Sequence, residues 1–266
     1  MRSEKKEEKI DEKEMLKLTL RLSFIIFNVC FIALVLCQNA SAGKWTPFQA
    51  AIWPPVQLFH EAASVCGLRL NLGQGRNENV WGIDAGVINT VANRQRGLQA
   101  GLLNQSEDAV GVSLGMANYT KQVKGLQAGL LNAARDHAAG LQAGIILNHS
   151  DYVRGMQVHA GILGNIADQV AGGQVGLSIP LLGFNFAQNI SGIQAAPLGF
   201  NHVENTAQGF QLALYNSAKQ MRGIQIGLVN FSGDLSGIQI GLFNKVERKW
   251  LPILPFINMD AGPSEQ

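Results

Sequence analysis

The chain has little cysteine, little charge and few aromatic residues. Of its 266 residues, only 3 are Cys, 15% are charged and 7% are aromatic. Three cysteines cannot form the dense disulfide framework of a small secreted scaffold. A net charge of +2 is too low for a nucleic-acid binder that works by neutralising phosphates. The 47% apolar content is nevertheless enough for a folded core, so a disordered chain is excluded as well.

The N-terminal part of the chain has the features of an export signal. An uncharged apolar run covers residues 22–37 and is followed by an Ala-Ser-Ala cleavage site at residues 40–42. The run is shorter than the about 20 residues that a membrane helix needs. We therefore predict a secretory signal peptide over residues 1–42, with an uncleaved anchor and a lipoprotein signal as less favoured alternatives. After cleavage at Ala42, Cys66 would be the only cysteine, with no disulfide partner in the same chain.

Glycine, by contrast, is abundant, and its positions are regular. All 30 glycines follow residue 42, and most belong to a unit Gly-x-Gln-x-Gly-x-x-Asn that recurs every 14 to 20 residues. This self-similarity indicates a repeat architecture, and the Gly spacing fits no phosphate-binding loop. The clearest copies supply the predicted structural residues of the motif, namely Gly97, Gln99, Gly101, Asn104, Gly125, Gln127, Gly129, Asn132, Gly223, Gln225, Gly227, Asn230, Gly237, Gln239, Gly241 and Asn244.

Each copy alternates with a period of two, which predicts a β-strand. Leu98, Ala100 and Leu102 fall on one face, and Gly97, Gln99 and Gly101 fall on the other. One short polar turn per copy favours antiparallel neighbours. We therefore predict an all-β, repetitive antiparallel meander, closed as an outer-membrane-type β-barrel of about 12–14 strands. The alternative is a β-solenoid of 14–15-residue coils, in which identical Asn and Gln residues stack and the last, proline-bearing copy forms a cap.

The repeats define the domain organisation. Residues 43–64 form a lead-in rich in Pro and Trp, residues 65–258 form one repetitive β domain, and residues 259–266 form a polar tail. In the first two copies the motif Gln is replaced by Arg69 and Asp84. These two side chains are expected to pair inward across a hairpin.

The motif resembles a family of bacterial surface repeat-containing proteins first noticed in leptospires. Besides the Gly-x-Gln-x-Gly-x-x-Asn unit, the resemblance rests on Pro-Val-Gln-Leu-Phe at 55–59, the Val-x-Gly-Leu-Arg-Leu-Asn hairpin, and Trp-Leu-Pro-Ile-Leu-Pro-Phe-Ile-Asn at 250–258. It covers residues 47–258. It implies export to the outer membrane or cell surface of a Gram-negative-type bacterium, and it implies no activity.

The search for chemistry gives no catalytic, cofactor-binding or metal-binding residues. The five His show no metal-ligand spacing, and no nucleophile lies near a base. We predict a non-enzymatic surface or outer-membrane repeat protein with a structural or interaction role. The alternatives are a pore-forming or transporter-like barrel, and a solenoid adhesin or binding module. The outer membrane is the expected partner, no nucleic acid or cofactor is expected, and the extracellular ligand is left open.

Overall fold

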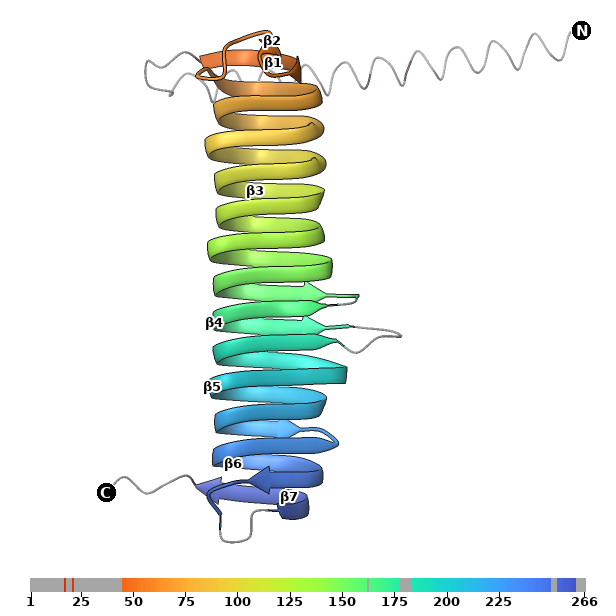
Figure 1. Cartoon of the computed structure of the whole chain (residues 1–266), viewed down its shortest axis with the longest axis vertical. Coiled ribbons are helices and arrows are strands. Elements are labelled where there is room, and N and C mark those ends of the chain that lie inside the picture. The colour runs from red at the N-terminus through yellow and green to blue at the C-terminus, as the bar shows by residue number, and fades with distance from the viewer. Residues whose placement is uncertain are drawn as a thin grey trace, which may run out of the picture.

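The computed structural model of the chain describes residues 17, 21, 45–161, 163–177, 183–249 and 253–261. Figure 1 shows a long, straight stack of β-coils. The elements are β1 (Trp45–Trp53), β2 (Val56–Gln57), β3 (Ser64–His159), β4 (Gly164–Gly176), β5 (Phe184–Ile226), β6 (Val229–Val246) and β7 (Ile253–Ala261). β3 alone passes through many coils without interruption. The predicted signal peptide, residues 1–42, lies almost entirely outside the described residues.

The chain is a parallel β-solenoid of about 11 turns, with coils of about 17 residues. Successive copies pair in parallel and in register, so that Gly155, Gly172 and Gly192 are direct neighbours. The prediction of an antiparallel meander closed into a barrel is therefore wrong. The structure has the architecture of the alternative, but its coils vary more than the predicted 14–15 residues, since stacked Asn side chains lie 14 to 20 residues apart.

The barrel prediction failed because it counted one turn per copy. In a strand the side chains alternate between the two faces, and two consecutive outward side chains mark a bend. Leu102 and Leu103 are both exposed, and so the coil bends inside the motif as well as at the polar segment. A further special position is the leading Gly, which has φ values between 114° and 147° in its successive copies. The backbone therefore bends in the same direction in every copy, and each coil stacks on the previous one.

The interior of the solenoid is polar and closely packed. The motif Gln and Asn side chains point inward and are buried, together with small residues such as Ala109 and Ala134. In the C-terminal half, larger apolar residues, among them Met221 and Leu235, join a continuous buried cluster. The bulky Leu and Ile residues of the motif point outward. The predicted alternation of faces is confirmed, but the small, polar face lines a filled core and no open lumen.

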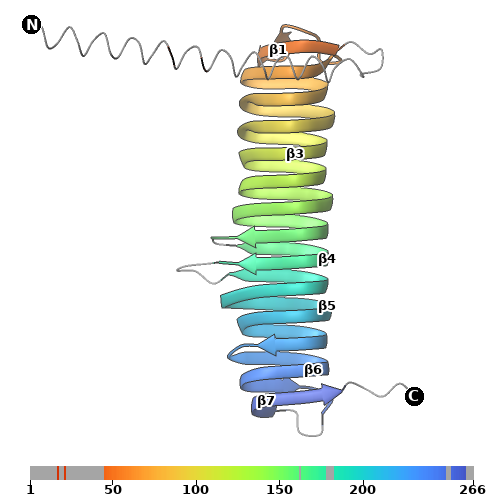
Figure 2. The same ribbon diagram turned by 180° about the vertical axis from the view of Figure 1, so that it is seen from behind.

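Both ends of the stack are covered by antiparallel segments. β1 lies parallel on the first coil, and β2 folds back antiparallel on β1. At the other end β7 pairs antiparallel with β6 (Figure 2). Such end caps shield strand edges that would otherwise pair with another chain. The expectation that the proline-bearing last copy forms a cap agrees with this position of β7.

Cys66 forms a disulfide in the structure of the full chain. Its side chain is buried. The expectation of a single cysteine concerns the chain after cleavage at Ala42, and it stays a prediction.

Candidate functional site

An uninterrupted ladder of Asn side chains runs through the interior. From Asn71 to Asn244, each Nδ2 donates a hydrogen bond of 2.8–2.9 Å to Oδ1 of the Asn one coil further on. In most coils Nδ2 also donates to a backbone carbonyl, as Asn104 does to Leu114 O at 2.8 Å. The predicted motif residues Asn104, Asn132, Asn230 and Asn244 all belong to this ladder. Buried polar groups with partners of this kind fix the register of neighbouring coils.

A second ladder is formed by the motif Gln residues, and it runs in the opposite direction. From Gln239 back to Gln127, each Nε2 donates to Oε1 of the Gln one coil earlier at 2.7–2.9 Å. Asn258 of β7 donates to Gln239 Oε1 at 3.4 Å, so the cap also ends the ladder. The predicted motif residues Gln127, Gln225 and Gln239 lie here.

The Gln ladder has one gap, at Ser113. This residue takes the Gln position between Gln99 and Gln127, and its short side chain reaches neither neighbour. Gln127 Nε2 donates instead to Thr120 Oγ1 at 3.0 Å. Gln99 Oε1, Ser113 Oγ and both amide atoms of Gln95 are buried without a hydrogen-bond partner. Unpartnered buried polar atoms are uncommon in proteins, so the gap leaves Gln99 and Ser113 incompletely hydrogen-bonded.

The N-terminal end of the Gln ladder is an ion pair. Arg69 donates from Nε to Asp84 Oδ1 at 2.7 Å and from Nη2 to Oδ2 at 2.6 Å. Asn71 and Gln99 also donate to the Asp84 carboxylate, at 3.2 and 3.0 Å. Both charged side chains are fully buried. The predicted inward pairing is confirmed, although the two residues lie in stacked parallel coils and not across a hairpin.

The motif glycines are required by the closeness of the coils. A Cβ on Gly125, where φ is +133°, would lie 2.1 Å from the carbonyl oxygen of Gly111. A Cβ on the second motif Gly, at Gly101, would lie 2.4 Å from Gly86 O and 2.5 Å from the Nδ2 of Asn89. The first Gly therefore permits the backbone conformation, and the second leaves room for the Asn ladder. Gly97, Gly129, Gly223, Gly227, Gly237 and Gly241 meet similar carbonyl contacts.

Among the described titratable residues, one histidine, His159, is fully buried. The residues that the structure describes include no group of three or more His, Cys, Asp or Glu that could bind a metal ion. Burial lowers the pKa of His159, against the smaller raising effect of a hydrogen bond with the backbone of Ile145. His159 Nε2 accepts a hydrogen bond from Gly161 N at 3.2 Å. It takes the place of the second motif Gly and belongs to the interior.

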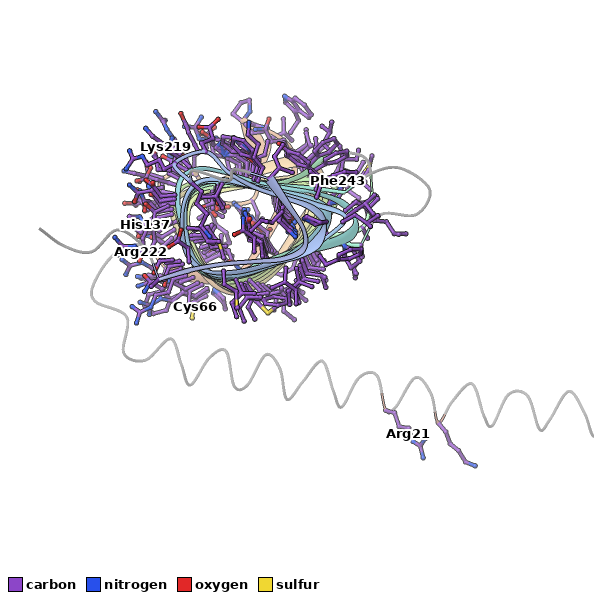
Figure 3. All side chains as sticks on the ribbon, turned by 90° about the horizontal axis from the view of Figure 1, so that it is seen from below. Arg21, Cys66, His137, Lys219, Arg222 and Phe243 are labelled. Atoms are coloured by element: carbon purple, nitrogen blue, oxygen red, sulfur yellow. The ribbon has the colours of Figure 1, made fainter. Side chains whose placement is uncertain are left out.

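The outer surface is divided into an uncharged half and a charged half. In the copies from Gly82 to Asn244, the only charged residue between a leading Gly and its closing Asn is the inward-pointing Asp84. All other charges lie between a closing Asn and the next leading Gly. Viewed along the axis in Figure 3, Phe243 lies on one side, and His137, Lys219 and Arg222 lie on the opposite side. We call the surface from leading Gly to closing Asn the uncharged face.

The uncharged face is large and exposes many bulky apolar side chains. Its members include Leu102, Leu103, Met116, Leu131, Ile145, Ile193, Leu228, Leu242 and Phe243, each exposed by 42–59%. About 11 turns spaced by about 4.8 Å give a length of about 50 Å, and six extended residues across give a width of about 20 Å. The whole face therefore covers about 1,000 Å² of uncharged surface, including its glycines and backbone.

From the sequence we identified the ladder residues but did not identify the uncharged face. We placed the outward apolar residues against lipid around the whole circumference of a barrel. The signal that could have revealed a one-sided surface is the confinement of charge to one half of each repeat.

The comparisons with known proteins give no further identification. No protein-family description, curated protein or solved structure matches the chain. Within the described residues, no helix has the length and apolar content needed to cross a membrane.

Proposed function

We propose that this chain is an exported, non-enzymatic binding module, a rigid solenoid whose uncharged face is the interaction surface. The observation that carries the proposal is the separation of charges, which repeats in every copy from Gly82 to Asn244. A soluble solenoid with no partner would gain solubility from charges on all sides. Exposed apolar patches larger than a few hundred Å² mark interaction surfaces in folded proteins. The export signal and the resemblance to leptospiral-type surface proteins support a place at the outer membrane or cell surface.

The interior supports a structural role for the motif residues. The Gln and Asn amides hydrogen-bond to one another and fill the core. The pore interpretation assumed an open lumen lined by these residues, and the filled core therefore does not support it. The absence of a nucleophile–base pair in the sequence supports a non-enzymatic role.

Partitioning between water and a non-ionic detergent phase tests the proposed function. Three exposed leucines of the uncharged face are changed together in L102D/L131D/L242D. The control, Q122D/Q169D/N205D, adds the same charge at three polar positions of the charged half. Because residues 22–37 contribute equally in every sample, we expect the full chain and the control to enter the detergent phase to the same extent, and the leucine variant to enter it less, with an unchanged circular dichroism spectrum. Equal partitioning of both variants would count against the proposed surface.

A further inference from the structure

The edges of the uncharged face carry bases but no acids. Arg96, Lys124, Arg154 and Arg222 each directly precede a leading Gly, are exposed, and form no ion pair with any described residue. We call these four residues the edge bases. The leading glycines stack on one another, since a Cβ on each would meet the carbonyl of the Gly one coil earlier. Four of the eleven leading glycines from Gly82 to Gly237 follow such a base, so the edge bases form an interrupted row at the border between the uncharged face and the charged half, on the side away from Phe243.

The carboxylates are held away from both edges. Between residues 90 and 244, every Asp and Glu lies at least three residues after a closing Asn and at least three before the next leading Gly. The opposite edge, formed by the residue after each closing Asn, contains aromatic rings, such as Tyr119 and Phe231, and the stacked pair Phe186 and His202 at 5.4 Å. Where a coil has a carboxylate, at least two residues thus separate it from the uncharged face on either side.

Depressions between the coils lie next to the edge bases. One, of about 450 Å³, is lined by Lys124 and Arg154 together with His137 and Tyr152, whose rings are 5.4 Å apart. A smaller one, of about 160 Å³, is lined by Arg96 and Lys124 and by the ion pair of Arg94 with Asp108. Arg96 is further held over the Trp81 ring at 4.8 Å. The larger hollow, which no carboxylate lines, suits a negatively charged group carried at the end of apolar chains.

We propose that the uncharged face docks on a lipid bilayer containing anionic headgroups, with the solenoid lying along the membrane surface. This proposal rests on the proposed function, because it names the partner of the same face. The exposed leucines would enter the acyl region, the edge bases would contact headgroup phosphates, and aromatic side chains would lie at the interface. Basic and aromatic residues favour that depth in membranes.

A second copy of the chain fits the same surface less well. Two uncharged faces packed together would bring the edge bases opposite either the same row or the aromatic edge. Neither edge carries a carboxylate. In such a dimer the edge bases would therefore have no anionic partner. In a bilayer, the lipid phosphates would supply one.

Flotation with vesicles tests the proposal on the full chain, so that residues 22–37 are the same in every sample. The vesicles are phosphatidylcholine alone, or phosphatidylcholine with phosphatidylglycerol. The edge variant is K124Q/R154Q/R222Q. The control, K121Q/R135Q/K219Q, removes the same charge from residues four or more positions before a leading Gly. Each base near an anionic surface changes binding by roughly fivefold. We expect the edge variant to lose roughly a hundredfold in binding to anionic vesicles and the control to lose less than tenfold.

The depth of insertion gives a second readout. In separate variants, L131W places an indole on the uncharged face and R135W places one on the charged half. Brominated lipid chains should quench the added fluorescence of L131W and leave that of R135W unchanged. Equal losses by the two charge variants, or equal quenching of the two indoles, would overturn the proposal.

The two proposals fail in different ways. If the chain enters detergent in a leucine-dependent manner but does not bind vesicles, only the lipid proposal is wrong. Leucine-dependent dimerisation without vesicle binding, measured by analytical ultracentrifugation, would likewise replace the bilayer by a second copy. If the leucine variant behaves like its control in detergent, the proposed interaction surface itself is wrong.

Discussion

The Nη2 atom of Arg69 lies 2.6 Å from Oδ2 of Asp84, inside the first coils and out of contact with water. The pair takes the place of two Gln residues, and Gln99 continues the ladder by donating to the Asp84 carboxylate. The interior at this end is thus held by charges where the rest of the solenoid uses neutral amides.

Removing one member of this pair should destabilise the chain strongly. In D84N, Arg69 stays buried without a counter-ion, and the free energy of unfolding should fall by about 3–5 kcal/mol. In R69Q/D84Q two further Gln residues extend the neutral ladder, and we expect little or no decrease in the free energy of unfolding. Urea unfolding followed by circular dichroism measures both. A double variant as unstable as D84N would show that the charges themselves are needed.

Alanine at a leading Gly should disturb the stacking of coils. In G125A, the Cβ would meet Gly111 O, and the residue would have to keep φ near +133°. Backbone strain of this kind costs about 1–3 kcal/mol before the steric contact is counted. The control is G173A, whose Cβ has no atom closer than 3.5 Å and whose φ is not positive. Thermal unfolding should show a clear loss for G125A and little change for G173A.

Filling the gap in the Gln ladder should stabilise the solenoid. In S113Q, the new amide can donate to Gln99 Oε1 and accept from Gln127 Nε2, as Gln does in the later coils. Each hydrogen bond contributes about 1 kcal/mol on average, so we expect a gain of about 1–2 kcal/mol. S113A, which removes the unpartnered hydroxyl without extending the ladder, separates the two effects. If S113Q is less stable than S113A in urea, the space at this position is too small for the longer side chain.

His159 should make the stability depend on pH. Burial lowers its pKa in the folded chain below the ordinary value of 6.5, which the unfolded chain keeps. As the pH falls below about 6.5, the unfolded chain binds the proton first, and so the free energy of unfolding decreases down to the folded pKa. H159Q should flatten this slope between pH 7 and pH 5, whereas H202Q, at an exposed position, should not. Parallel slopes for H159Q and the unchanged chain would contradict the assignment.

Much of the architecture could be predicted from the repeats. The strands, the inward position of Gln99, the outward position of Leu102, and the inward pairing of Arg69 with Asp84 follow from alternation with a period of two. The inward position of Asn104 does not, because strict alternation would place it on the same face as Leu102. The direction of pairing did not follow, because a period of two is the same in parallel and antiparallel strands. The bend at Leu102 and Leu103 looks like a continuing apolar strand in the sequence.

The sequence by itself determined that the chain is a repetitive β protein with two faces and with charges in one half of each repeat. Local alternation and composition are sufficient for these properties. Only the tertiary structure decided that the chain coils upon itself, because coil closure depends on bends that are seen only when the copies stack. Stacking brings each Asn within 2.8–2.9 Å of the next and places the edge bases in an interrupted row at the border of the uncharged face. The same amino acids would have formed an open lumen in a barrel, and here they form a filled core with one apolar side.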